Sequence, residues 1–184
     1  MRLHAFSPRR LAGATAIASA AALIPVAALA ATGSPAAPVS AASTPGCSTT
    51  GLVAWITYEQ GAAGAFYYSL NFTNLSGHAC TLRGHPGVSA VSLGGGQVGA
   101  QARWGNPGNA KLGTVRLGNG ATATAVLAIT DVGVFPPTAC HQVMAAGLRV
   151  YPPGQSASRL IPYPFSACST RQRFMTVAVL QKQK

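Results

Sequence analysis

The chain has 184 residues, long enough for one ordinary domain, and 48% of them are hydrophobic, which excludes a disordered protein despite 21 glycines and 13 prolines. Lysine and arginine number 13 against only two acids, Glu59 and Asp131, so the net charge is +11 and contact with polyanions is favoured. Beyond the first thirty residues the basic residues are scattered singly, whereas proteins that recognise nucleic acid concentrate them on one face, so we expect no nucleic-acid partner.

Residues 1–30 have the three parts of a secretory signal. A basic segment ends at Arg10, an apolar stretch runs over 11–29, and Ala28-Leu29-Ala30 forms a small-x-small cleavage site. We therefore predict a signal peptide over 1–30 and a secreted, extracellular protein with no stable membrane span after cleavage. An uncleaved anchor is the alternative, because the stretch approaches the roughly 20 residues that span a bilayer, although its alanines and Pro25 weaken that interpretation.

Residues 31–46 are rich in Ala, Ser, Thr and Pro and contain no aromatic residue, which predicts a disordered linker. The residues just before Cys47 are Thr44-Pro45-Gly46, without the leucine-containing box that precedes a lipid-modified cysteine. We expect no lipid anchor on Cys47, and we place the folded domain over 47–184.

All four cysteines follow this linker: Cys47, Cys80, Cys140 and Cys168. An even number in an exported domain predicts two disulfides, for which three pairings exist. We favour Cys47 with Cys80 and Cys140 with Cys168, because each pair closes a local loop worth about 3 kcal/mol in the chain-entropy model. The crossed pairings remain open on these grounds.

Short segments rich in β-branched and aromatic residues recur between glycines and prolines, the pattern of a β-sandwich. The clearest is 65–72, where Phe66, Tyr68, Leu70 and Phe72 share the face expected to be buried, and Tyr67, Ser69 and Asn71 share the other. The further candidate strands are 52–58, 79–82, 88–93, 97–104, 112–117, 121–129, 147–151, 159–162 and 174–180.

Alternation gives two of these strands a predicted buried face. In 121–129 that face carries Ala123, Ala125, Leu127 and Ile129, and in 174–180 it carries Met175, Val177 and Val179. Turn residues agree, since Gly118-Asn119-Gly120 and Pro152-Pro153-Gly154 both lie between candidate strands.

The sequence contains no recognisable arrangement of catalytic residues. The two acids are too far apart in the chain to suggest a carboxylate pair for glycoside hydrolysis, and neither a Gly-x-Ser-x-Gly elbow nor a Ser-x-x-Lys motif occurs. His78 and His141 lie beside cysteines but without the spacing of a zinc site. We therefore expect no enzyme, no metal and no cofactor.

Several motifs in fixed order resemble a known family. They are NFTNLSG at 71–77, CTLRGHPGV at 80–88, LGNGATAT at 117–124, GLRVYPPG at 147–154, and Cys168 ahead of a final strand. Together they span about 47–180 and resemble the secreted actinobacterial family called domain of unknown function 4232. The resemblance implies an immunoglobulin-like β-sandwich, supports the local disulfide pairing, and implies no activity.

His85 stands where an aromatic residue is usual before Pro-Gly in that family. Between Gly84 and Gly87, the pair His85-Pro86 is suited to a tight turn, because glycine adopts positive φ and proline fixes its own φ. We expect His85 at the tip of a loop, as an incidental polar residue of the turn.

The leading hypothesis is a non-enzymatic extracellular module that acts by contact, with an anionic cell-envelope polymer or a protein as its partner. Loss of Arg2, Arg9 and Arg10 with the signal would lower the charge from +11 to +8, still strongly basic. Arg149 and Arg159, which flank the Pro-Pro-Gly turn, are the candidate contact residues. The alternatives are a secreted protease inhibitor that uses a Pro-Gly loop as a plug, and a hydrolase that gathers a histidine with an acid, from His78, His85, His141, Asp131 and Glu59.

Overall fold

A computed structural model describes residues 43–107 and 109–183, so the predicted signal peptide over 1–30 and most of the linker over 31–46 lie outside the described residues. The strands are β1 (Leu52–Ala62), β2 (Ala65–Asn74), β3 (Cys80–Arg83), β4 (Gly87–Val91), β5 (Gln97–Val98), β6 (Arg103–Trp104), β7 (Thr114–Leu117), β8 (Thr122–Thr130), β9 (Gln142–Tyr151), β10 (Arg159–Cys168), β11 (Met175–Val177) and β12 (Gln181–Lys182). Two short 3-10 turns, η1 (Thr49–Gly51) and η2 (Val132–Val134), accompany them. Over these two described ranges, no helix has the length and hydropathy needed to cross a membrane.

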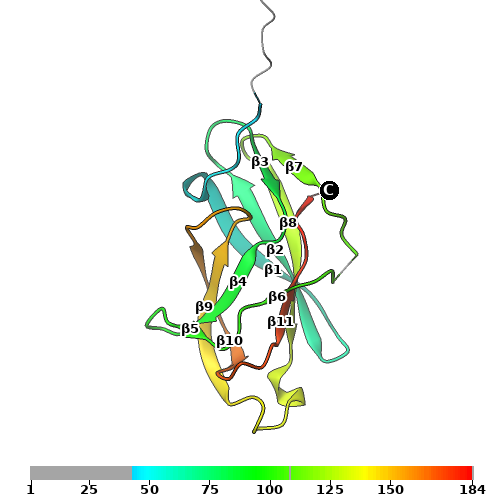
Figure 1. The fold of residues 1–184 in the computed structure, drawn as a ribbon, viewed down its shortest axis with the longest axis vertical. Helices are drawn as coiled ribbons and strands as arrows, with labels where there is room; N and C mark the ends of the chain where they lie inside the picture. The colour runs from blue at the N-terminus through cyan, green and yellow to red at the C-terminus, as the bar shows by residue number, and fades with distance from the viewer. Residues whose placement is uncertain (1–42, 108, 184) are drawn as a thin grey trace, which may run out of the picture. The chain divides into compact units, whose positions relative to one another are not determined.

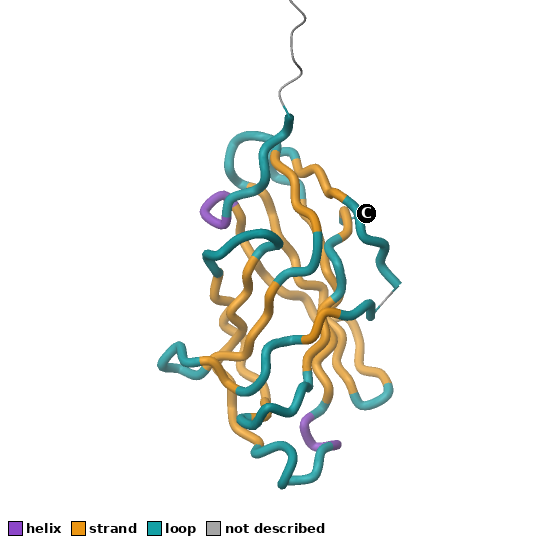
Figure 2. The backbone as a smooth tube through the Cα atoms, viewed as in Figure 1, coloured by secondary structure: helices purple, strands orange, loops and turns teal. Residues whose placement is uncertain are grey.

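The strands form two main sheets whose buried faces share one core (Figures 1 and 2). One sheet has the order β1-β2-β8-β11-β6, with β12 also paired to β8, and the other has the order β10-β9-β4-β5. Strands β3 and β7 form a small additional sheet. Among the described strands, β6 with β11 is the one parallel pair. The predicted all-β, immunoglobulin-like antiparallel β-sandwich is confirmed.

Alternation along the strands explains the core. In β8 the residues Ala123, Ala125, Leu127 and Ile129 are buried while their neighbours are half-buried, as predicted. The prediction for the last strand is right for Met175, Val177 and Val179 but incomplete, because Phe174, Ala178 and Leu180 are buried as well. This segment is therefore covered on both faces, which alternation alone does not reveal.

Strand β2 shows two departures from its predicted pattern. Tyr68, Leu70 and Phe72 are buried as predicted, but Phe66 is 41% exposed. Phe66 pairs with Gly61 near the end of the β1–β2 hairpin, where the β1 residues are all exposed, so this end of the hairpin lies outside the core.

Asn71 is the second departure, because it was expected to face solvent and is only 1% exposed. Its side chain accepts a hydrogen bond from the Thr124 hydroxyl at 2.7 Å and donates one to the Ser69 carbonyl at 3.0 Å. Its polar groups are thus paired within the sheet, so burial of the amide leaves no donor or acceptor unsatisfied and costs little free energy.

The turn after β2 is organised by a fully buried asparagine, Asn74. Its side-chain amide donates to the carbonyls of His78, Leu117 and Gly118 at 2.8 to 3.1 Å. Its carbonyl oxygen accepts from the backbone and hydroxyl of Ser76. Asn74 therefore joins the NFTNLSG motif to the LGNGATAT motif, two segments that are distant in the sequence.

The structure joins Cys47 to Cys80 and Cys140 to Cys168, the local pairing that the sequence favours. The first disulfide holds the start of the domain against β3, where Cys47 also donates to the Thr81 carbonyl. Pro45, from the end of the predicted linker, accepts a hydrogen bond from Thr81 as well. The second disulfide links the end of β10 to the segment before β9, and both strands are longer than predicted.

The segment 97–104, predicted as one strand, is two short strands in different sheets. β5 pairs with β4 in one sheet, and β6 pairs with β11 in the other. Between them Gly99 adopts φ +62°, and a Cβ there would collide with the carbonyl oxygen of Cys168. The chain crosses from sheet to sheet at this glycine, and the crossing delivers Trp104 to the surface.

Candidate functional site

The most exposed aromatic side chain on the strands is Trp104, at the end of β6 and 65% exposed. The His85 ring stacks on it with 5.3 Å between ring centroids and 10° between planes. The Nε2 of His85 lies 3.2 Å from the carbonyl oxygen of Gly105, which fixes the ring beside the indole. An indole held in place by a stacked ring is a preformed flat contact surface.

This geometry corrects the expectation for His85. The residue is half-buried and packed on Trp104, not displayed at a loop tip. The turn is tight, as predicted: Gly84 has φ +113°, and its carbonyl accepts a hydrogen bond from Leu180. The expectation is wrong because the partner of His85 comes from the sheet crossing, which the local sequence does not disclose.

A hollow of about 380 Å³ opens between the His-Pro-Gly turn and the Tyr-Pro-Pro-Gly turn. It is lined by His85, Trp104 and Gln101, and by Tyr151 and the turn that follows β9. Two motifs that carry the family resemblance, 80–88 and 147–154, therefore meet at one hollow. The aromatic rings give it apolar walls, and Gln101 adds donors and an acceptor.

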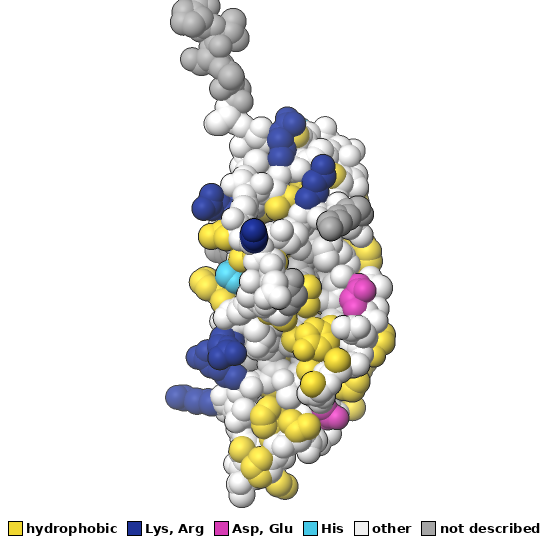
Figure 3. Space-filling model, turned by 90° about the vertical axis from the view of Figure 1, so that its right-hand side faces the viewer, with side chains coloured by type: hydrophobic (Ala, Val, Ile, Leu, Met, Phe, Trp, Pro, Cys, Tyr) yellow, Lys and Arg dark blue, Asp and Glu magenta, His cyan; other side chains and the backbone are white. Residues whose placement is uncertain are grey.

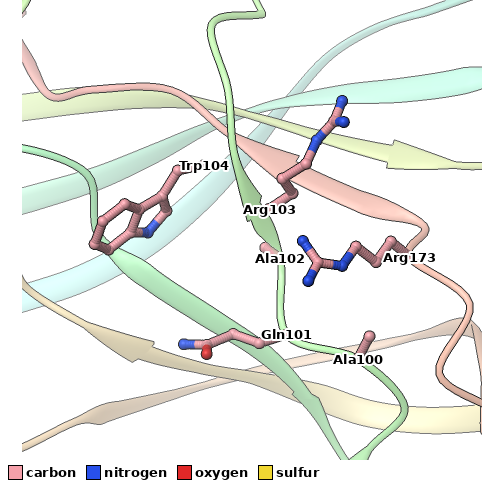
Figure 4. A pocket seen from close by; sticks show the side chains of 6 residues that line it. All are labelled: Ala100, Gln101, Ala102, Arg103, Trp104 and Arg173. Atoms are coloured by element: carbon pink, nitrogen blue, oxygen red, sulfur yellow. The ribbon is translucent and has the colours of Figure 1, made fainter.

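A second hollow of about 390 Å³ is lined by the 100–104 segment and shares Gln101 and Trp104 with the first. Arg103 and Arg173 line it, and no acidic residue does. Figure 4 shows the Arg173 side chain extending toward the chain at Ala102, whereas the Arg103 side chain points away from Trp104 and Gln101. We call Gln101, Arg103, Trp104, Arg173 and His85 the Trp104 surface.

On the face shown in Figure 3, the basic and acidic side chains are separated in space. Figure 3 shows Lys and Arg side chains at one end and along one edge of the visible face, on either side of a His, with the acidic side chains toward the opposite edge. The scattered basic residues of the sequence are thus partly gathered by the fold. Such a distribution gives one side of the domain a positive potential that attracts anions.

The arginines proposed from the sequence as contact residues bind carbonyl oxygens of the protein itself. Arg149 donates to the Gly95 carbonyl at 2.6 Å, and Arg159 donates to the Thr49 and Thr50 carbonyls at 3.0 and 2.9 Å. These guanidinium groups hold the turn after β4 and the η1 turn. Neither lines the hollows beside Trp104.

The residues considered for catalysis have separate roles in the structure. Asp131 accepts a hydrogen bond from the Gly133 backbone at 2.9 Å and so caps the η2 turn. His141 is exposed, and its backbone carbonyl accepts from Ser169. Across the part of the chain that the structure describes, no three His, Cys, Asp or Glu residues are placed to hold a metal ion. Of the three histidines within 43–183, His85 alone belongs to the Trp104 surface.

One of the Pro-Gly loops that could serve as an inhibitor plug, Pro152-Pro153-Gly154, is packed rather than protruding. Pro152 and Pro153 are buried, and the loop closes with a hydrogen bond from Gln155 to the Pro152 carbonyl. An inhibitory loop must enter a protease cleft, and this one instead lines a hollow. We find no observation that favours the inhibitor.

Trp104 is the residue that the sequence analysis missed. It was assigned to the end of a long strand without a role, because neighbouring residues gave it no periodic pattern. One signal was present: a tryptophan directly after an arginine and before a glycine, in Gln101-Ala102-Arg103-Trp104-Gly105, is unlike a core strand. Only the structure shows that His85 stacks on it and that Arg173 lines the same hollow.

Comparison with known proteins gives one family. The family model described as Domain of unknown function (DUF4232) matches residues 47–180. No curated protein and no solved structure matches the chain.

Proposed function

Because the chain belongs to the family described as Domain of unknown function (DUF4232), whose description names no activity, we propose a function from the surface of the chain itself. The domain is a non-enzymatic extracellular module that binds an anionic polymer of the cell envelope through the Trp104 surface. The observation that carries this proposal is an exposed tryptophan, fixed by a stacked histidine, that lines one hollow with two arginines and no acidic residue.

The chemistry of the surface suits such a ligand. Tryptophan and arginine are the residues that most often dominate binding energy when they lie in an interface. A guanidinium group pairs with carboxylate or phosphate through two parallel hydrogen bonds, and the indole face packs against the apolar part of the ligand. Arg173, whose side chain extends toward Ala102 (Figure 4), lines the same hollow as Trp104 and is the arginine that we assign to the ligand.

Export from the cell is part of the proposal. Two disulfides persist in oxidising compartments and are rare in reducing ones. The predicted signal peptide over 1–30 provides the route, and the family resemblance favours a secreted actinobacterial protein. A basic domain outside the cell meets the polymers of its own envelope at high local concentration, so even modest affinity is sufficient for attachment.

The test is binding of the purified exported protein to the envelope fraction of the producing cell, measured by co-sedimentation. We expect Trp104→Ala and Arg173→Gln each to weaken binding about tenfold, the effect of removing a central interface residue. Raising the salt concentration should weaken binding by the intact protein steeply, because exposed charges are screened beyond about 8 to 10 Å at physiological ionic strength.

Matched controls are available elsewhere on the chain. Trp55→Ala removes a second tryptophan, 40% exposed on β1, and Arg149→Gln removes a charge outside both hollows. Both should leave binding within about threefold of the intact protein. If the controls lose as much binding as the Trp104 and Arg173 variants, net charge alone explains the interaction and the proposed surface is overturned. Unaltered binding by the Trp104 and Arg173 variants would overturn it as well.

A further inference from the structure

A third hollow on the described part of the chain is also basic. It has a volume of about 360 Å³, and its lining includes Lys111, Arg116 and Lys182 but no acidic residue. The three cations come from three elements, the loop before β7, β7 itself and β12. Gln181 donates to the Lys111 carbonyl at 2.6 Å, which holds the loop beside β12. We call these residues the Lys111 hollow.

The Lys111 hollow and the Trp104 surface are connected through β11 and β12. Val177 of β11 pairs with Trp104, and Gln181 of β12 follows only four residues later. At about 3.3 Å per residue, plus about 5 Å between paired strands, the Cα atoms of Trp104 and Gln181 lie within about 20 Å of each other. Figure 3 shows basic side chains continuing along one edge past a His, in agreement with a shared basic side.

Resting on the proposed function, we propose that the ligand is an acidic glycan chain that spans from the Trp104 surface to the Lys111 hollow. Each end alone is weak, because its cations are exposed and screened by salt. A single chain that reaches both ends binds more tightly than two separate pieces, because the second contact forms at high effective concentration once the first has formed.

The exposed Trp104 favours a glycan as the ligand over a polyanion without sugar rings, such as polyphosphate. Trp104 presents an apolar indole face that is 65% exposed. A sugar ring carries an apolar face of C–H groups that packs on such a ring, whereas a polyphosphate chain has no apolar face to offer. The arginines and lysines then pair with the carboxylate or phosphate groups that the glycan carries. The recognised feature is therefore a sugar ring and an anionic substituent, repeated along a chain.

The experiment measures the affinity of the full exported protein for galacturonate oligomers of about two and about ten sugar units, and for polyphosphate of matched charge. We expect the long oligomer to bind at least about tenfold more tightly than the short one. We also expect it to bind more tightly than polyphosphate, with Trp104→Ala abolishing that preference. A single-stranded DNA oligomer of equal charge serves as the further comparison.

Variants separate the two ends. Lys111→Gln with Lys182→Gln should remove the advantage of the long oligomer and leave the short one unchanged, while Arg149→Gln with Arg159→Gln, an equal loss of charge elsewhere, should preserve the advantage. Urea denaturation of each variant checks that the fold is intact. Equal affinity for long and short oligomers, or equal or tighter binding of polyphosphate or DNA, would overturn the inference. Failure of the protein to bind any envelope polymer would instead overturn the proposed function itself.

Discussion

The turn around Asn74 and the surface around Trp104 are both places where distant sequence motifs meet, but their polar groups have different partners. At the turn, the Asn74 side chain is fully buried and bonds to four residues of the protein, His78, Leu117, Gly118 and Ser76. At the Trp104 surface, the Arg103 and Arg173 side chains and the indole are exposed beside open hollows.

The difference separates motifs that build the fold from motifs that leave a surface open. A buried polar group that bonds only to its own protein contributes to stability and specificity of folding. An exposed aromatic ring fixed by a neighbour contributes little to the free energy of unfolding and remains available to a ligand. The comparison therefore predicts opposite effects of substitution on stability and on binding.

The largest effect on stability is expected for Asn74→Ala. It removes the buried amide that donates to the Leu117 carbonyl and to the part-buried His78 and Gly118 carbonyls, and the oxygen that accepts from Ser76, so the free energy of unfolding should fall by about 3 to 5 kcal/mol. Urea denaturation measures the change. As the matched control, Asn119→Ala removes an exposed acceptor for the Gly77 backbone and should cost about 1 kcal/mol. A loss below 1 kcal/mol at Asn74 would contradict its structural role.

The disulfides should contribute the next largest effect, and they test how the Trp104 surface is supported. Replacing either cysteine pair by alanine should cost about 3 kcal/mol, because the sequence separations, 33 and 28, are similar. Only loss of the Cys140–Cys168 bridge should change the fluorescence of Trp104, since Gly99 crosses against the Cys168 carbonyl. A Trp55→Phe background isolates the Trp104 signal, and an equal change from both pairs would contradict this support.

A smaller effect concerns the pair formed by the buried Tyr68 and the half-buried Tyr163. The hydroxyls of Tyr68 and Tyr163 lie 3.0 Å apart, and burial, followed by this hydrogen bond, raises the pKa of Tyr68 above its ordinary value. The folded state thus favours the protonated phenol, so this stabilisation is complete below about pH 10 and is lost as the pH rises beyond it. Tyr68→Phe should cost about 1 kcal/mol at neutral pH and flatten the alkaline decline in melting temperature. If the alkaline decline in melting temperature is unchanged in the variant, titration of groups other than Tyr68 causes it.

The smallest effect on stability is expected at Trp104 itself. Trp104→Ala should lower the free energy of unfolding by less than about 1 kcal/mol, because the ring is exposed and contacts mainly His85. The same variant should show the large loss of envelope binding described above. Measured together by denaturation and co-sedimentation, the two results sharpen the contrast with Asn74. A loss of several kcal/mol would place Trp104 with the structural residues instead.

The fold was predictable because its signals are local. The alternation in β8 follows from residues two apart, and short loops favour the observed pairing of Cys47 with Cys80 and of Cys140 with Cys168 over the crossed pairings. Turn residues marked most strand ends. These features need no knowledge of which segments pack together.

The site was not predictable because its geometry is non-local. The segment 97–104 has the composition of one strand, but Gly99 turns it between sheets against a carbonyl from the end of β10. His85 gains its partner only through that crossing. Phe66 and Asn71 were misplaced for a related reason, since alternation assigns a face of the sheet but not whether another element covers it.

The disulfide arrangement also sets the order in which the two bridges can form as the chain emerges. Each bridge joins cysteines that are consecutive in the sequence, so a chain that emerges with its N-terminus first presents Cys47 and Cys80 before Cys140 appears. Oxidising each pair as it emerges therefore gives the native connectivity, with no need for thiol exchange to correct crossed bridges. The first native bridge is available while the residues of β7 to β12 have yet to emerge.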